Sequence, residues 1–277
     1  MWDNLARLVR YRGLIQSLVV RDLKARYRGS VLGFFWSFIN PLLLLMVYTV
    51  VFRYFMVRPG SDPNDPNALG GPYAVFLFCG LLPWTWFTSA LLESAGSLIF
   101  SGNLIKKVLF PAEVLPLVSV LSTMAHFFFG LPILAGFLIY YEFIDPAAYI
   151  HLHFTKLLWF PVVVAVQLIF TSALALLLSS LTVHYRDIKD LLGNLLTFWF
   201  FVTPIIYWYK KSPIPKSWLN WNPFFHLAVS YQEVLFIPDN VFGHKKWLLA
   251  MGAGSIVLFL GAYWVFDRLR DSFAEAV

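Results

Sequence analysis

Six long stretches of mostly apolar residues constrain this chain more than any other feature of its sequence. A helix needs about 20 such residues to cross about 30 Å of hydrocarbon. Inside lipid the backbone has to satisfy its own hydrogen bonds, so each stretch is expected to be a helix. An apolar fraction of 59% and a charged fraction of 13% also favour lipid over water as the solvent. The predicted spans are residues 31–52, 72–100, 114–141, 156–181, 191–208 and 247–266.

The positions of lysine and arginine predict how these spans are oriented. Basic residues favour the cytoplasmic side, and the segment before the first span carries the densest cluster of them. We therefore expect the N-terminus, the second and fourth connections and the C-terminus to be cytoplasmic. The fifth connection is an exception, because it should be external and yet holds several lysines. The N-terminal cluster consists of Arg7, Arg10, Arg12, Arg21, Lys24, Arg26 and Arg28.

The fold class expected is an all-α integral membrane protein with a single transmembrane domain over residues 1–277. Residues 1–29 form an amphipathic interface helix in this scheme, because leucine, isoleucine and valine recur on one helical stripe beside arginines. Residues 31–266 hold the six spans, and residues 267–277 form a cytoplasmic tail. Aromatic and apolar residues between prolines in the fifth connection predict a re-entrant helical segment. The net charge of +6 lies at span ends, so we expect no nucleic-acid partner.

Residues 21–52 carry the most specific motif of the chain. The motif has the form D-L-x-x-R-Y-R-x-S-x-L-G-x-x-W, running from Asp22 to Trp36, and an apolar span with Pro41 follows it. This pattern resembles the membrane subunit of ABC transporters that export polysaccharides, a family that includes exporters of O-antigen, capsule and teichoic acid. Segments 103–111, 184–190, 203–207 and 221–223 are similar to later motifs of the same family.

The resemblance implies a function and a set of partners. It implies that two copies of the chain form a channel for a polyprenyl-pyrophosphate-linked polysaccharide, of which O-antigen is the first expectation, in a bacterial inner membrane. Two copies of a separate ATPase would supply the energy. The chain has no G-x-x-x-x-G-K-[ST] loop, so we expect ATP and magnesium to be bound by that partner. No cofactor, metal or catalytic residue is expected in this chain.

The resemblance also implies two groups of polar site residues. Lys24, Arg26 and Arg28 lie at the expected membrane interface, where arginine could grip pyrophosphate oxygens in a fork-like geometry. Topological anchoring explains the same residues equally well. The second and fourth connections look like the family's contacts with the ATPase, although positive-inside anchoring also explains their basic residues. The coupling residues predicted there are Asn103, Lys106, Lys107, Arg186 and Asp187.

Aromatic residues make up 19% of the chain, and some of their clusters lie deep within the predicted spans. Tryptophan and tyrosine at the membrane interface account for many of them. Others could line a glycan channel, because aromatic faces can contact the C–H faces of sugar rings without fixed hydrogen bonds. The predicted lining residues are Phe35, Trp36, Tyr48, Trp84, Trp86, Phe198, Trp199 and Tyr207.

Two other functions were weighed against polysaccharide export. An ABC permease for a small drug-like molecule would share the fold and the coupling connections. A polyprenyl-linked glycosyltransferase would need gathered acidic or histidine residues, whereas the acids here are scattered and His151 and His153 form a lone pair. Glu93 and His126 are polar residues within spans. For these two residues hydrogen bonding between helices is favoured over a proton path.

Overall fold

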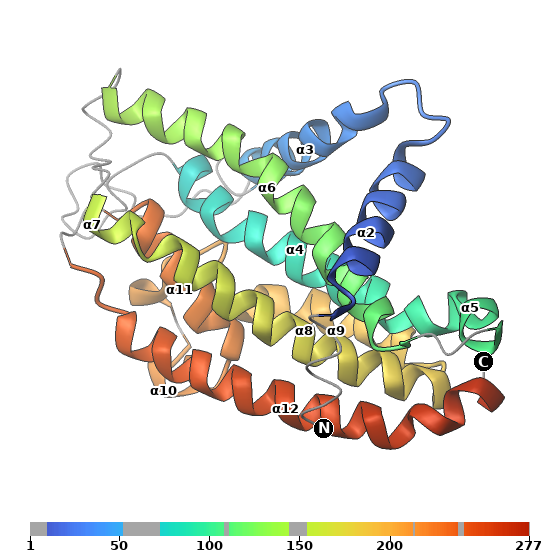
Figure 1. The fold of residues 1–277 in the computed structure, drawn as a ribbon. Helices are drawn as coiled ribbons and strands as arrows, with labels where there is room; N and C mark the ends of the chain where they lie inside the picture. Colours follow the sequence, from blue (N-terminus) through green and yellow to red (C-terminus); the bar gives the residue numbers. More distant parts are fainter. Residues whose placement is uncertain are drawn as a thin grey trace.

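The computed structural model describes residues 10–51, 73–107, 111–143, 154–212, 214–237 and 241–276, and in this part of the chain the ordered elements are all helical. Four helices are long and apolar enough to cross a membrane, so the chain is an integral membrane protein. They are α4 (Tyr73–Phe100), α6 (Val114–Phe143), α8 (Phe160–His184) with the short α7 (Phe154–Leu157) before it, and α12 (Lys245–Ala276). Figure 1 shows these helices running alongside one another.

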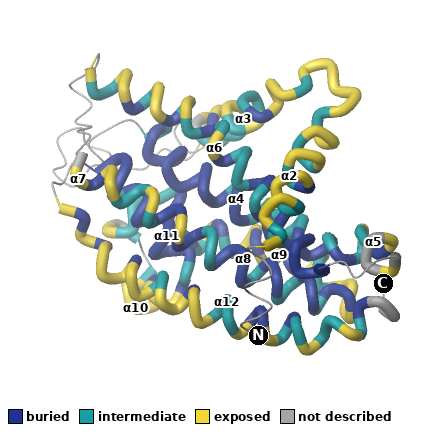
Figure 2. The backbone as a smooth tube through the Cα atoms, viewed as in Figure 1, coloured by how far each residue is buried: buried dark blue, intermediate teal, exposed yellow. Residues whose placement is uncertain are grey.

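Helix α4 forms the centre of the bundle. It packs against α6, α8 and α11 (Pro223–Leu235), and most of its length is buried (Figure 2). Phe76 and Phe87 are fully buried, and the indole of Trp86 donates a hydrogen bond to the carbonyl of Val120 in α6. Because buried residues recur around α4 along most of its length, this helix is surrounded mainly by other helices of the bundle.

The N-terminal part of the described chain forms a helical hairpin. Helix α2 (Arg12–Tyr27) is followed by a turn, the 3-10 helix η1 (Gly33–Phe35) and α3 (Trp36–Val50). Gly29 and Gly33 have φ values of 81° and 49°, which L side chains rarely adopt, so glycine permits this sharp turn. Part of the predicted interface helix is thus helical, from Arg12 to Tyr27, and residues 1–9 lie outside the described residues.

Helix α9 (Ile188–Val202) ends six residues before the end of the fifth predicted span at Trp208. Thr203 is extended, with ψ of 135°, and it precedes Pro204. The proline ring disfavours the helical region for the residue before it, and the extended backbone of Thr203 ends α9 at this point. The predicted boundary at Trp208 was therefore wrong, and the last part of that stretch turns towards α11.

Helix α11 lies inside the bundle, preceded by η4 (Tyr209–Lys211) and α10 (Lys216–Leu219). All of its residues except Pro223 and Glu233 are buried. Asn222 caps its N-terminus by accepting hydrogen bonds from the backbone N–H groups of Phe224 and Phe225. At its other end the ammonium of Lys156 donates to the carbonyls of Glu233 (3.0 Å) and Ile237. Polar side chains thus fix both ends of this buried helix.

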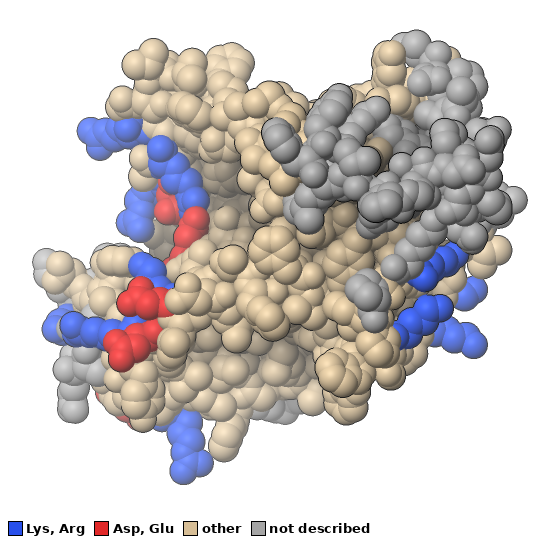
Figure 3. All heavy atoms as spheres, turned by 180° about the vertical axis from the view of Figure 1, so that it is seen from behind, with Lys and Arg blue, Asp and Glu red and all other residues tan. Residues whose placement is uncertain are grey.

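Charged side chains gather at two opposite sides of the face drawn in Figure 3, and a broad band of other residues separates them. We call the side that carries the short helix α5 (Gly102–Lys107) and the C-terminus the α5 end (Figure 1). The other side, which carries α7 and the first turn of α12, is called the opposite end. This separation of charge is the distribution expected for a protein that crosses a bilayer.

Candidate functional site

Arg26, in the last turn of α2, joins three helices. Its guanidinium donates to Asp22 one turn earlier (2.9 Å), to Glu93 of α4 (2.7 Å) and to Ser122 of α6 (3.3 Å). Five N–H donors in a planar fork can bridge several acceptors at once. The side chain of Arg26 is only 28% exposed. These contacts fix the end of α2 against α4 and α6.

Two carboxylates therefore surround one guanidinium. Burial lowers the pKa of Arg26, but the hydrogen bonds and charges of Glu93 and Asp22 outweigh burial and raise that pKa above its ordinary value. In this conformation Arg26 is bound by carboxylates of its own chain, and these would compete with any phosphate for the same donors. Lys24 and Arg28, the other two predicted headgroup residues, are exposed on either side of it.

A second hydrogen-bonded group lies next to Arg26. The hydroxyl of Tyr27 lies 2.6 Å from Nε2 of His126 and also contacts the hydroxyl of Ser37. Nδ1 of His126 lies 3.0 Å from the carbonyl of Ser122, which can only accept. A neutral His126 therefore carries its proton on Nδ1 and accepts from Tyr27 through Nε2. Glu93 and His126 thus both make hydrogen bonds between helices, as expected for polar residues within spans.

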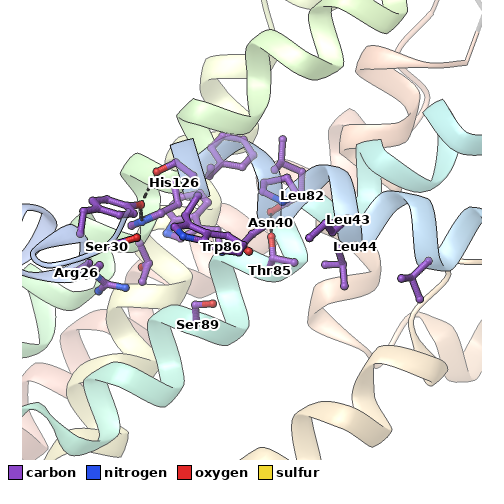
Figure 4. A pocket seen from close by; sticks show the side chains of 17 residues that line it. Arg26, Ser30, Asn40, Leu43, Leu44, Leu82, Thr85, Trp86, Ser89 and His126 are labelled. Carbon is purple, nitrogen blue, oxygen red and sulfur yellow. Dashed lines mark hydrogen bonds between the residues drawn. The ribbon is translucent and has the colours of Figure 1, made fainter. Parts of the chain in front are cut away.

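These groups border a cavity of about 870 Å³ between the α2–α3 hairpin on one side and α4 and α6 on the other. Figure 4 shows Arg26 and Ser30 at one end of the cavity and Leu43 and Leu44 at the other. One end of the cavity is therefore polar and bordered by a cation, and the other end is lined with aliphatic carbon. An amphiphile with a polar head and a hydrocarbon tail matches this division. The side chains that supply its other polar atoms are Tyr27, Ser37, Asn40, Thr85, Ser89, Thr123 and His126.

The predicted channel-lining aromatics fall into three groups. Phe35, Trp36 and Phe198 are exposed, and Trp36 also borders the cavity. Tyr48, Trp199 and Tyr207 are half-buried. Trp84 and Trp86 are buried in the core. Trp84 packs edge-on against Phe224 of α11, with 4.8 Å between the ring centres, and Trp86 also borders the cavity.

The predicted coupling residues lie in two connections of the described chain. Asn103 and Lys106 are exposed on α5, and Arg186 and Asp187 are exposed between α8 and α9. The side chain of Lys107 is outside the described part. The ammonium of Lys189, in the first turn of α9, lies 4.9 Å from the ring centre of Phe100, the last residue of α4. This contact brings the two connections together at the α5 end.

Sequence reasoning missed the pairing of Arg26 with Glu93, which lies 67 residues further along the chain. The Asp22–Arg26 pair could have been found, because residues four apart face each other on a helix. Among the described residues no group of three or more histidine, cysteine, aspartate or glutamate side chains is arranged to hold a metal ion.

Comparison with known proteins places the chain in a family. Residues 13–236 match the family model described as ABC-2 type transporter. The chain is 38% identical to the O-antigen export system permease protein RfbA of Myxococcus xanthus, over 98% of this chain and 97% of that protein. It is 31% identical to the RfbA protein of Klebsiella pneumoniae, over 95% and 94%. It is 22% identical to the polysialic acid transport protein KpsM of Escherichia coli, over 80% of each. The chain therefore belongs to the ABC-2 type transporter membrane family.

Proposed function

We propose that this chain is the membrane subunit of an ABC transporter that exports a lipid-linked polysaccharide, with O-antigen as the first expectation. The observation that carries the proposal is the similarity over almost the full length to permeases named for O-antigen export. The polar and aliphatic ends of the cavity beside Arg26 support it, since a polyprenyl-linked glycan is itself polar at one end and hydrocarbon at the other.

The proposed topology has six spans, with the α5 end in the cytoplasm. Helices α3 and α9 have 15 residues each and would complete the count, with α3 extended by η1 and both shorter than the four long helices. The arginines of α2 favour the cytoplasmic side for that helix and hence for the α5 end. Helix α11 would enter from the opposite side and return without crossing, and its end contacts support this re-entrant position.

Two copies of the chain would form the channel. The different polarity of the exposed side chains on α9 and α12 supports this proposal. The exposed side chains of α9 include Asn194 and Thr197 among its leucines and phenylalanines. The exposed side chains of α12 between Trp247 and Trp264 are all apolar. A polar side chain facing lipid is costly, so α12 suits lipid, whereas α9 suits a second copy or a polar channel.

The headgroup would be received beside α2. Lys24 and Arg28 are exposed cations near the polar end of the cavity, and Arg26 borders it. A pyrophosphate would first meet Lys24 and Arg28, and it would have to compete with Glu93 and Asp22 for Arg26. The ATPase would dock on the exposed residues of the two connections at the α5 end.

The test is to delete this chain and its ATPase separately and to measure surface and lipid-linked polysaccharide. Trapped lipid-linked polysaccharide after either deletion is the expected result, and the glycan on that lipid would name the substrate. Normal surface polysaccharide together with accumulation of a small compound would instead identify a permease for small molecules, the alternative that shares this fold.

A further inference from the structure

Helix α12 is longer than a membrane span requires. Its 32 residues extend over about 48 Å at 1.5 Å per residue, whereas the hydrocarbon layer is about 30 Å thick. The apolar part ends at Phe266, and Asp267, Arg268, Arg270 and Asp271 follow. We call residues 267–276 the end segment of α12. It projects at the α5 end, where Figure 1 places the C-terminus beside α5.

One contact of the end segment is to an unusual carboxylate. Glu113 lies just after the connection that contains α5, and its side chain is only 2% exposed. Neither of its oxygens accepts a hydrogen bond within the described part of the chain. A buried carboxylate without hydrogen bonds is costly and calls for an explanation. A cation lies close to it, because Nη1 of Arg270 in the end segment is 3.8 Å from its Oε2.

A second contact of the end segment is to the other connection. The hydroxyl of Ser272 shares a hydrogen bond of 3.0 Å with Nε2 of His184, the last residue of α8. Phe273, the next residue, is fully buried against Phe266, in an apolar cluster that also contains Val183, Leu98 and Ala112. The end segment therefore touches the base of both connections that carry the predicted coupling residues.

The distance between Arg270 and Glu113 makes this link adjustable. An N–H···O bond to a carboxylate is normally about 2.7–2.9 Å long, so the pair is about 1 Å too long to be closed. Arg270 is 30% exposed and has room to move, whereas Phe273 anchors the segment. A small displacement of the α5 connection would close this pair and relieve the unpaired carboxylate.

We propose that the end segment of α12 couples the two ATPase-facing connections, with Arg270 as a positioning residue that closes on Glu113 when the ATPase drives the α5 connection inward. The inference rests on the proposed function, because it requires an ATPase at the α5 end. It predicts that breaking the link separates ATP hydrolysis from export and leaves the assembly of the complex intact.

The experiment compares Arg270→Gln, Glu113→Gln and the double variant in the complex with its ATPase. Surface polysaccharide is measured in cells, and ATP hydrolysis is measured with the purified complex in proteoliposomes. For each variant we expect export per ATP hydrolysed to fall about tenfold, as about 1.4 kcal/mol of weakened coupling would give. The double variant should lose no more than either single variant, because both act through one contact.

Arg268→Gln is the matched control. Arg268 lies in the same segment, and its guanidinium lies 5.6 Å from the ring centre of Trp264 in its own helix. This variant should keep the ratio of export to hydrolysis. Ser272→Ala tests the second contact. It removes the bond to His184 together with the bond that the hydroxyl donates to the carbonyl of Leu269 in its own helix, and because neither bond involves a charged carboxylate we expect a smaller loss of about threefold.

Each outcome separates the inference from the proposed function. Wild-type export with normal coupling in Arg270→Gln and Ser272→Ala would overturn the inference and leave polysaccharide export standing. A complex that purifies with its ATPase at wild-type yield, and hydrolyses ATP but exports poorly, would support it. Loss of ATPase association in Arg270→Gln would also overturn it, because the link would then serve assembly. Failure of the wild-type complex to export polysaccharide would refute the proposed function itself.

Discussion

At the scale of single residues, the most informative finding is that Arg26 already has partners. The sequence presents it as one of three cations before the first span, and topology or phosphate binding could explain all three. The structure distinguishes Arg26, because its guanidinium bridges Asp22, Glu93 and Ser122. Arg26 therefore has a structural role in holding α2 whether or not it also receives a phosphate.

Arg26→Lys should lower both stability and export. Lysine keeps the charge and the orientation signal, but an ammonium cannot reproduce the planar fork that bridges α4 and α6. Because the ion pairs are partly exposed, we expect the free energy of unfolding to fall by about 1 kcal/mol. Thermal unfolding in detergent and surface polysaccharide in cells measure the two effects. Arg21→Lys, at an exposed arginine of the same helix, is the control. Equal behaviour of the two variants would contradict the bridging role.

A buried histidine pair near the opposite end predicts a pH dependence of stability. Nδ1 of His226 lies 2.9 Å from Nε2 of His244, and Nε2 of His226 lies 3.1 Å from the carbonyl of Asn220. Neutral His226 therefore carries its proton on Nε2 and accepts from His244 through Nδ1. Burial, followed by the charge that His226 can carry, lowers the pKa of His244 to about 4. The carboxylate of Glu233 accepts a hydrogen bond of 2.9 Å from the backbone N–H of His244.

Since the pKa of His244 is lower in the folded protein than in the unfolded chain, the unfolded state binds more protons between about pH 4 and 6.5. Stability should be fully present above pH 6.5 and should fall by up to about 3 kcal/mol as the pH is lowered towards 4. The slope of stability against pH is measured by thermal unfolding at about 0.5-unit steps between pH 7.5 and 4.5. His244→Gln keeps a donor towards His226 but cannot titrate, so it should flatten the profile. An unchanged profile in that variant would assign the slope to another group.

At the scale of elements, the sequence was sufficient where a segment is long and apolar. The four long helices lie where the apolar runs predict them, because lipid leaves such a run no alternative to a helix. The end of α9 was missed because hydropathy continues through Tyr207, and a proline alone does not mark a helix end in this chain, where Pro41, Pro83 and Pro132 lie inside α3, α4 and α6. The packing of α11 inside the bundle depends on distant partners such as Lys156, and a single sequence does not show such pairings.

Asn222 is the residue on which the α9–α11 connection most depends. Its carbonyl oxygen accepts from the indole of Trp199 (2.7 Å) and from two backbone N–H groups of α11, and its amide donates to Thr203 (2.9 Å). Asn222→Ala would leave these buried groups unsatisfied, so we expect a loss of about 2–3 kcal/mol in the free energy of unfolding. Thermal unfolding measures it. Asn220→Ala removes an exposed amide two residues away, and a loss of equal size there would refute the capping role.

At the scale of the whole molecule, the surface differs in kind between α9 and α12. Both helices expose large apolar side chains, and exposure alone does not distinguish lipid from protein as the neighbour. The exposed amide of Asn194 makes the α9 face less suited to lipid, whereas the hydroxyl of Thr197 donates to the carbonyl of Gly193 in its own helix. The α12 face exposes no polar side chain between Trp247 and Trp264. A membrane protein that assembles around a polar path needs one face of each kind. If two copies assemble as proposed, the residues exposed on α9 would face the channel or the second copy.

Single cysteines on the two helices distinguish these faces. Phe198 of α9 and Val257 of α12 are each 70% exposed, so the two positions are matched in accessibility. The native Cys79 is fully buried and should not react, which gives a parent without background crosslinking. We expect Phe198→Cys, or the same change one turn away at Leu195 or Phe201, to give a disulfide-linked dimer in membranes under mild oxidation. Val257→Cys should remain monomeric, because its face is covered by lipid.

The crosslinked dimer should reflect a specific pair of chains and not chance collisions in the bilayer. Crosslinking through Phe198→Cys should therefore keep its yield when the membrane is diluted with added lipid, since a specific pair stays together whereas chance encounters become rarer. A yield that falls in proportion to dilution, or a dimer formed equally through Val257→Cys, would place lipid against α9. In that case Asn194 would need a partner within the same chain, as the hydroxyl of Thr197 already has in the carbonyl of Gly193 (2.9 Å). The channel would then have to lie along the α2–α3 hairpin, where the cavity beside Arg26 already divides into a polar and an aliphatic end.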